Sequence, residues 1–281
     1  MMNKILTISV SAVFAAVMLG CGSSDDGGET ATNYLTGESV VISTPAEAQN
    51  AIAASASFGF SGNRATPSPS RKAPSFAPVS DSIACTDGGS ISINGDAAET
   101  ETGSSNMTYM YNNCVEYGST MNGSMSMVGT QYTYTANMTN LSIVDSEGSM
   151  NLNFNQTIST NSTYDPFTVI MSGTMDYAFN SPQNSGQIGY QNFQLMLQDS
   201  DTSGSLDGDM SITSSTYSCV DGRYHYETID LLTFAYDGMI TGGTMKVNDA
   251  TYVFNSEGTA TVTFSDGTTA TVQQAAEAVC N

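Results

Sequence analysis

Four aspartates in one short segment are the residues of this chain whose types and spacing come closest to a chemical site. Asp199, Asp201, Asp207 and Asp209 lie within 11 consecutive residues that also contain two glycines. Carboxylate oxygens at flexible spacing are the ligands that calcium prefers, whereas a zinc site needs nitrogen or thiolate ligands. We therefore predict that any ion bound by this chain is calcium at these aspartates, where it would stabilise a hairpin loop.

The spacing of these acids resembles a calcium loop of the EF-hand or dockerin type. Counted from Asp199, acids stand at positions one, three and nine, glycine at position six and leucine at position eight. Position twelve, where that family has a bidentate glutamate, is Met210 in this chain, and the flanking sequences have the pattern of strands. The resemblance therefore implies a weak site, and a polar hairpin loop in an acidic protein explains the same residues without an ion.

Residues that could act as catalytic acids, bases or nucleophiles are sparse. His225 is the single histidine, and period-two alternation places it on the same strand face as Glu227. The two could form an acid–base pair or a surface contact between strands. The sequence contains no nucleophile elbow, phosphate-binding loop or zinc-protease motif. We expect a protein that is not an enzyme.

Cysteine usage indicates disulfides in an exported protein. Cys85, Cys114, Cys219 and Cys280 follow an earlier cysteine at position 21, and an even number of cysteines is typical of oxidising compartments. Cys85 and Cys114 are equidistant from the acidic stretch at residues 98–103, so a hairpin that turns there would bring them opposite one another. This geometry predicts the pairs Cys85–Cys114 and Cys219–Cys280.

The charge of the chain excludes one class of partner. Residues 83–281 contain 21 acidic side chains and two basic ones, Arg223 and Lys246, and the whole chain has a formal net charge of −21. Two cationic side chains cannot neutralise a row of phosphates, so we expect no binding to nucleic acid. The same charge would be repelled by an anionic lipid surface, so attachment to a membrane would have to come from a lipid anchor.

The elements that must position these residues are predicted to be strands. From residue 83 onward apolar side chains recur with a period of two, as in Met150, Leu152, Phe154 and Ile158, and Asn-Gly or Asp-Gly pairs separate such runs. This pattern predicts an all-β domain, an antiparallel meander of about 11–13 strands with one apolar face. A sheet of this kind would close as a barrel, form a half-barrel around a helix, or fold over as a sandwich.

An internal repeat predicts interruptions within these strands. Tyr111–Cys114, Met138–Leu141 and Tyr190–Phe193 share the order apolar, polar, asparagine, apolar, and each shifts the alternation by one residue. Such a shift is typical of a β-bulge. Asn122-Gly123 also lies inside an alternating run, which favours a bulge there over a turn. The strand pattern is preceded by a capping box that starts at Thr44 and predicts a short helix over residues 45–57.

The first residues of the chain have the pattern of an export signal. Lys4 precedes an apolar run at residues 5–19, which is too short for an ordinary membrane-spanning helix. Val17–Cys21 resembles the lipobox of bacterial lipoproteins, although that class usually has leucine where this chain has Met18. The resemblance implies cleavage before Cys21 and lipidation of Cys21.

Together with the strand pattern and the Pro/Ser-rich composition before it, this resemblance divides the chain into three parts: a signal peptide at residues 1–20, a lipid-anchored tether with a short helix and a Pro/Ser-rich linker at residues 21–82, and a β domain at residues 83–281. It also implies a lipid-anchored location at the outer membrane of a bacterium with two membranes, facing the periplasm or the cell surface. The function is a separate expectation: the many strands with one apolar face exceed what a small, filled barrel needs, so we expect the domain to be a binding module for an apolar ligand or lipid. A structural or adhesive surface lipoprotein without a small-molecule ligand is the alternative.

Overall fold

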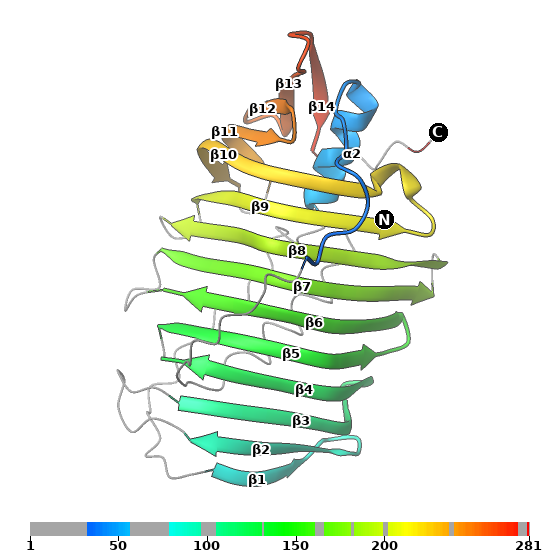
Figure 1. Ribbon diagram of the computed structural model, residues 1–281, viewed down its shortest axis with the longest axis vertical. Coiled ribbons are helices and arrows are strands. Elements are labelled where there is room, and N and C mark those ends of the chain that lie inside the picture. Colours follow the sequence, from blue (N-terminus) through cyan, green and yellow to red (C-terminus); the bar gives the residue numbers. More distant parts are fainter. Residues whose placement is uncertain are drawn as a thin grey trace.

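The computed structural model covers the chain of 281 residues and describes residues 33–56, 79–96, 105–130, 132–160, 166–180, 183–198, 202–235, 239–274 and 280. The predicted signal peptide, the lipidation site at Cys21 and the Pro/Ser-rich linker lie outside these residues. Within them, the fold is the predicted all-β meander with one short α-helix (Figure 1).

Fourteen strands form one antiparallel sheet in which each strand pairs with its neighbour in the sequence. The number exceeds the predicted range by one. The strands are β1 (Val79–Ala84), β2 (Ser90–Asp96), β3 (Ser105–Glu116), β4 (Ser119–Gly129), β5 (Thr133–Val144), β6 (Gly148–Ser159), β7 (Phe167–Asn180), β8 (Gln183–Gln198), β9 (Ser203–Ser214), β10 (Gly222–Phe234), β11 (Ile240–Val247), β12 (Ala250–Phe254), β13 (Thr259–Thr263) and β14 (Thr269–Gln273).

The sheet is open. β1 pairs only with β2 and β14 only with β13, so the two edge strands lie at opposite ends of the molecule (Figure 1). A closed barrel, one of the three predicted closures, is therefore not formed. The sheet instead keeps two edges and curves around its apolar side.

The predicted β-bulges are present at all three asparagine repeats. The strand registers shift between Tyr111 and Cys114, between Met138 and Leu141, and between Gln191 and Gln194. The repeat asparagines have positive φ angles of 48° at Asn113, 47° at Asn140 and 50° at Asn192. Asparagine tolerates this left-handed conformation better than other side chains, which explains its recurrence at the bulges.

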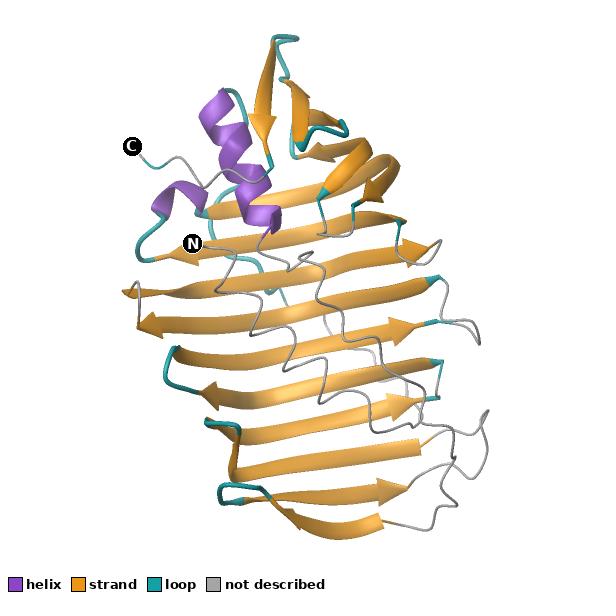
Figure 2. Ribbon diagram, turned by 180° about the vertical axis from the view of Figure 1, so that it is seen from behind, coloured by secondary structure: helices purple, strands orange, loops and turns teal. Residues whose placement is uncertain are grey.

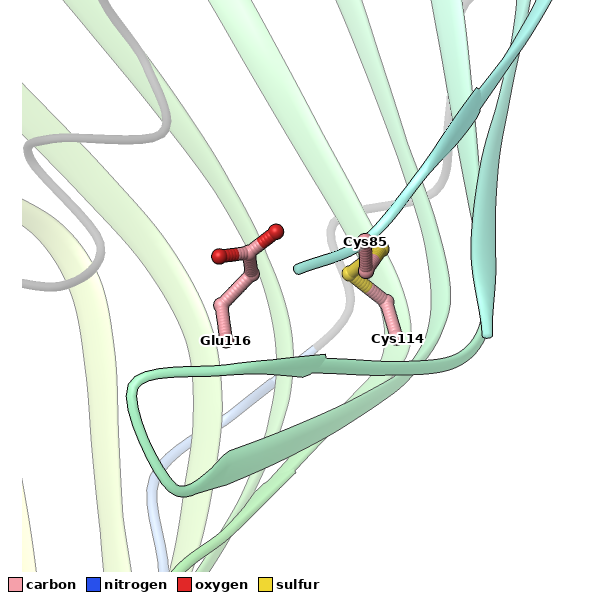
Figure 3. Close-up of side chains that lie close together, drawn as sticks. All are labelled: Cys85, Cys114 and Glu116. Carbon is pink, nitrogen blue, oxygen red and sulfur yellow. A yellow bond between two sulfur atoms is a disulfide. The ribbon is translucent and has the colours of Figure 1, made fainter. Parts of the chain in front are cut away.

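The bulges lie at matching positions of the ladders from β3 to β9, except that the β6–β7 ladder has no register shift. The β4–β5 register shifts between Asn122 and Ser124, as predicted, and a Cβ atom on Gly123 would collide with the carbonyl oxygen of Asn140. Gly208 has the same relation to Asn192 on β8. A bulge bends the strand that contains it, so these bulges bend the sheet between β3 and β9 along a line that we call the crease. Figure 3 shows the corner that β3 turns beside Cys114, whose side chain points toward the inner side of the bend.

We call the apolar, concave side of β3–β9 the inner face and the opposite, polar side the outer face. The helix α2 (Pro45–Ala56) begins at the predicted capping box, in which Glu47 accepts hydrogen bonds from the backbone of Ser43 and Thr44 at 2.9 Å each. It packs on β14 and on the short 3-10 helix η1 (Ser218–Val220), on the same side of the sheet as the inner face (Figure 2). The alanine-rich side of α2 is buried there.

Residues 33–44 form a strap that crosses the outer face before α2 begins (Figure 1). The backbone N–H of Thr36 donates to Ser211 Oγ at 3.1 Å on β9, and Val40 and Glu38 exchange backbone hydrogen bonds with Arg223 at 3.0 and 2.8 Å. The chain then passes the β11–β12 turn, where the N–H of Ile42 donates to Asp249. The strap and α2 lie within the predicted tether segment at residues 21–82, and both contact strands of the β domain.

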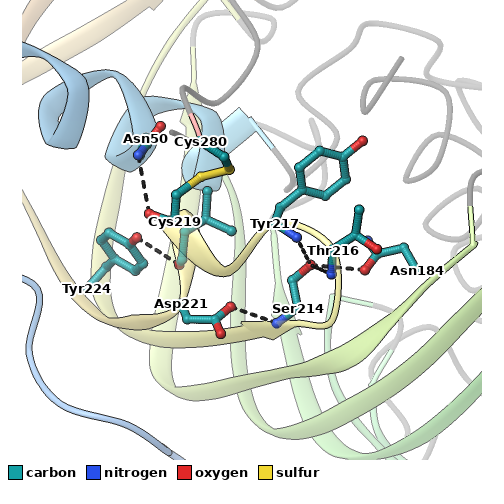
Figure 4. The surroundings of a disulfide bond; sticks show 10 residues. Asn50, Asn184, Ser214, Thr216, Tyr217, Cys219, Asp221, Tyr224 and Cys280 are labelled. Carbon is teal, nitrogen blue, oxygen red and sulfur yellow. Dashed lines mark hydrogen bonds between the residues drawn. A yellow bond between two sulfur atoms is a disulfide. The ribbon is translucent and has the colours of Figure 1, made fainter.

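Both predicted disulfides are formed, Cys85–Cys114 and Cys219–Cys280. The second holds residue 280 against η1, where the side chain of Asn50 on α2 donates to the carbonyl of Cys219 at 3.2 Å (Figure 4). Beside it, Asp221 accepts the N–H of Ser214 at 2.7 Å. Partial burial raises the pKa of Asp221, and this hydrogen bond opposes the shift. The β9–β10 connection is thus fixed to both the helix and the end of the chain.

Candidate functional site: the inner face of the bent sheet

The inner face is a continuous apolar surface that is rich in methionine. Neighbouring strands place these side chains opposite one another, as in the pairs Met107–Met127 and Tyr109–Met125 on β3 and β4. Side chains two residues apart along a strand point to the same side of the sheet. Each bulge adds one residue to its strand, and the apolar side chains beyond it still point to this side. The buried apolar residues of β3–β8 on this face are Met107, Tyr109, Tyr111, Cys114, Met125, Met127, Ala136, Met138, Leu141, Ile143, Met150, Leu152, Ile158, Val169, Met175, Ile188, Tyr190, Phe193 and Leu197.

Buried tyrosines lie between this surface and α2. Tyr224 is 1% exposed and donates its hydroxyl to the carbonyl of Val220 at 2.8 Å, and Tyr252 donates to the carbonyl of Ala48 at 3.3 Å. Burial raises the pKa of Tyr224 and of Tyr252 and keeps both hydroxyls protonated. These hydroxyls fix η1 and α2 to the sheet, which is a structural role.

One polar side chain interrupts the apolar surface of β6. Gln156 occupies the inner-face position between Phe154 and Ile158, is 2% exposed, and its Oε1 atom has no hydrogen-bond partner. Its cross-strand neighbours are Ala136 on β5 and Met171 on β7. The sequence analysis missed this residue, although a signal was present, because the alternating series of β6 has glutamine at one apolar position.

Two of the four aspartates of the predicted calcium site lie on a strand, and the other two lie outside the described residues. Gln198 pairs with Ser203, so the β8–β9 hairpin turns between them, and Asp199 and Asp201 lie outside the described residues. Asp207 and Asp209 lie within β9, beyond the turn. The loop that the sequence suggested is therefore continued by a regular strand.

Asp207 and Asp209 already have partners on β10. Asp207 accepts the backbone N–H of Thr228 at 2.8 Å, and Asp209 Oδ1 lies 2.8 Å from His225 Nδ1. The His225 and Asp209 side chains are 54% and 43% exposed, which is typical of a surface contact between strands. Glu227, the other candidate partner of His225, is paired in register with Lys246 on β11.

A second group of possible metal ligands is a disulfide with a neighbouring carboxylate. Cys85, Cys114 and Glu116 lie close together (Figure 3), but the two sulfur atoms are bonded to each other and offer no thiolate. Glu116 accepts hydrogen bonds from the N–H and the hydroxyl of Thr86 at 2.8 Å each, and these bonds lower the pKa of its carboxyl. The group therefore joins the β1–β2 turn to β3.

In the part of the chain that the structure describes, no helix has the length and apolarity needed to cross a membrane. Comparison of the chain with protein-family models, with curated proteins and with solved structures found no match.

Proposed function

We propose that this protein is a lipoprotein of the bacterial outer membrane, anchored through Cys21, and that its inner face binds the acyl chain of a lipid or another apolar ligand. The lipobox-like sequence at Val17–Cys21 supports the anchor. The shape and composition of the inner face support the ligand. We propose a binding role without catalysis, because the described residues hold no acid–base or nucleophile arrangement on this face.

The observation that carries the proposal is a bent, apolar, methionine-rich sheet without a second sheet in the described residues. Stable domains bury the apolar side of a sheet against a second layer. Here α2 supplies part of such a layer, but its main contacts are with β14 and η1, at one end of the sheet. A linear acyl chain lying along the crease would extend that layer over β3–β8.

The side chains of the inner face suit a flexible apolar ligand. Met125 and Met127, on β4, are 1% and 0% exposed and belong to this face. Methionine has an unbranched, adaptable side chain that repacks around different shapes, which is why it recurs at surfaces that bind varied apolar partners. The tyrosines near α2 would mark the polar end of such a surface.

Mass spectrometry of the purified full-length protein under native conditions tests the ligand. The expected result is a co-purifying acyl lipid. A photoactivatable acyl lipid with an uncharged head group should then cross-link to the inner-face peptides that contain Met125 and Met127. Met110, which is 48% exposed on β3, provides the matched outer-face control and should not be labelled. A protein free of lipid, or cross-links confined to Met110, would contradict the proposal and favour a structural or adhesive surface lipoprotein.

Metabolic labelling with a palmitate analogue tests the anchor separately. Wild-type protein should incorporate the label and fractionate with the outer membrane, whereas a Cys21→Ala variant should do neither. Equal labelling of the two proteins would show that Cys21 is not the lipidated residue.

A further inference from the structure

We propose that Gln156 determines ligand specificity, and that the inner face selects an uncharged amphiphile whose head group donates a hydrogen bond from a hydroxyl or an amide. This inference rests on the proposed function and deepens it. Its starting point is the amide oxygen of Gln156, which is buried without a hydrogen-bond partner.

The position of Gln156 directs its side chain into the apolar surface. β6 has no residue at positive φ, so Met150, Leu152, Phe154, Gln156 and Ile158 follow one another on the same face. Four of these five side chains are apolar. The glutamine is thus the one member of the β6 series that can exchange a hydrogen bond with a molecule on the inner face.

The surroundings of Gln156 leave its oxygen as an isolated acceptor. Ala136, directly opposite on β5, is too short to reach over the amide and has no polar side-chain atom. Met171, opposite on β7, carries a thioether, which cannot donate a hydrogen bond. A buried acceptor without a donor is unfavourable, and native proteins retain such groups where a water, an ion or a ligand satisfies them.

Charge decides which head group fits this acceptor. An anionic carboxylate offers no donor to an amide oxygen and would enter a protein of net charge −21. A hydroxyl or an amide N–H donates to the oxygen and carries no charge. A monoacylglycerol, with one acyl chain and a neutral glycerol head, has this chemistry and serves as the probe.

Competition between two probes of equal chain length tests the proposal on the full-length protein in detergent micelles. Monopalmitoylglycerol provides hydroxyl donors, whereas methyl palmitate has the same chain but only acceptors. Wild-type protein should prefer monopalmitoylglycerol by about tenfold, the ratio expected for one net hydrogen bond. Gln156→Met replaces the amide by an apolar side chain of similar length and should abolish this preference while retaining binding of methyl palmitate.

Asn155→Ala is the matched control, because Asn155 is the adjacent, exposed residue of β6 and bonds to Asn137 on the outer face. This variant should retain the wild-type preference. Gln156→Leu repeats the test if the methionine variant does not fold. If neither probe binds to wild-type protein, the proposed function fails. If both probes bind equally well, or if Gln156→Met retains the preference, the proposed function stands and the role of Gln156 is refuted.

Discussion

Three asparagines at equivalent bulges set the curvature on which the inner face depends. Each adopts positive φ, and its backbone N–H donates to a side chain of the neighbouring strand: Asn113 to Asn122 at 2.8 Å, Asn140 to Asn153 at 2.8 Å, and Asn192 to Ser172 at 2.9 Å. The bulge removes this N–H from the regular ladder, and the polar side chain replaces the lost acceptor. The repeat seen in the sequence is therefore a repeat of backbone conformation.

A substitution at Asn140 tests this conformational role. Asn140→Val should reduce the free energy of unfolding by about 1–3 kcal/mol, because a β-branched residue is strained at a φ of 47°. Asn140→Gly should be nearly neutral, since glycine adopts positive φ without steric strain. Chemical denaturation followed by circular dichroism measures both. Similar losses in the two variants would mean that the asparagine side chain, and not its φ angle, matters.

Buried tyrosines make the stability of the protein sensitive to high pH. Burial raises the pKa of Tyr111 to about 12 and raises the pKa of Tyr190 as well. In the unfolded chain tyrosine ionises near pH 10, so the stability that these groups contribute is present below pH 10 and is lost as the pH rises above it.

We therefore expect the free energy of unfolding to fall between pH 10 and pH 12, with a smaller fall in a Tyr190→Phe variant. Tyrosinate absorbance of Tyr190 should then appear together with the loss of sheet structure seen by circular dichroism. Full ionisation of all tyrosines in a protein that keeps its sheet would contradict this expectation.

Two kinds of residue show how far the sequence alone can go. The bulge asparagines were predictable because each one breaks a period of two, and periodicity is a local property. The sequence groups Asp207 and Asp209 with Asp199 because they are close along the chain. In the folded protein, the pairing of β9 with β10 places Asp207 in hydrogen-bond contact with Thr228, and Asp209 with His225. Such pairing depends on register with a later strand, which the spacing of acids does not encode.

At the level of elements, the two edges of the open sheet differ in how they are protected. On β14 the side chain of Gln49 donates to the carbonyl of Gln273 at 2.7 Å and accepts its N–H at 3.0 Å, as a neighbouring strand would. On β1 the described side chains are exposed, and Asp81 accepts the N–H of Ser82 at 2.7 Å. Covering an edge with a helix and placing a charge on it are two ways to prevent edge-to-edge association.

Removal of the glutamine amide should expose the β14 edge. Gln49→Ala is expected to reduce the free energy of unfolding by about 1–3 kcal/mol, from two hydrogen bonds to the backbone, and to promote association through β14. Analytical ultracentrifugation measures the association, and denaturation measures the stability. Gln183→Ala, at an exposed position of a distant hairpin, serves as the control and should change neither. A Gln49→Ala protein that is as stable and as monomeric as the control would show that α2 protects the edge without this side chain.

The order and type of elements were predictable, whereas their arrangement in space was less so. Alternation predicted the strands, and the capping box at Thr44 predicted α2. The strap at residues 33–44 carries no periodic signal, and its contacts join residues more than 170 positions apart. Alternation also does not distinguish an open sheet from a barrel, since both have one apolar face.

At the level of the whole molecule, charge is the dominant property. A net charge of −21 on 281 residues favours solubility but destabilises the compact state through self-repulsion. The described residues include one carboxylate in a close ion pair, Asp209 with His225, so most of this charge is balanced by solvent ions. Salt should therefore stabilise the protein by screening.

Calcium provides a test that separates screening from specific binding. If Asp199, Asp201, Asp207 and Asp209 bind calcium, millimolar calcium chloride should raise the unfolding temperature more than sodium chloride of equal ionic strength. EDTA should reverse the effect, and an Asp201→Asn variant should lose it. Equal shifts with the two salts would leave these residues as part of an acidic surface. Weak affinity, about 10⁻⁴–10⁻³ M, is expected for a site that lacks a bidentate glutamate.

Because of the strap, the resistance of the domain to a pulling force should depend on the direction of that force. Tension applied to the chain before residue 33 enters the fold where the strap crosses β9 and reaches β10, at the parallel bridge between Ser39 and Arg223. A pull directed along the strap loads the two hydrogen bonds that Glu38 and Val40 make with Arg223 together, in shear, whereas a pull away from the sheet breaks them one after another. A cell-surface protein with this attachment would resist drag parallel to the strap better than lifting forces, and single-molecule pulling in the two directions would measure the difference.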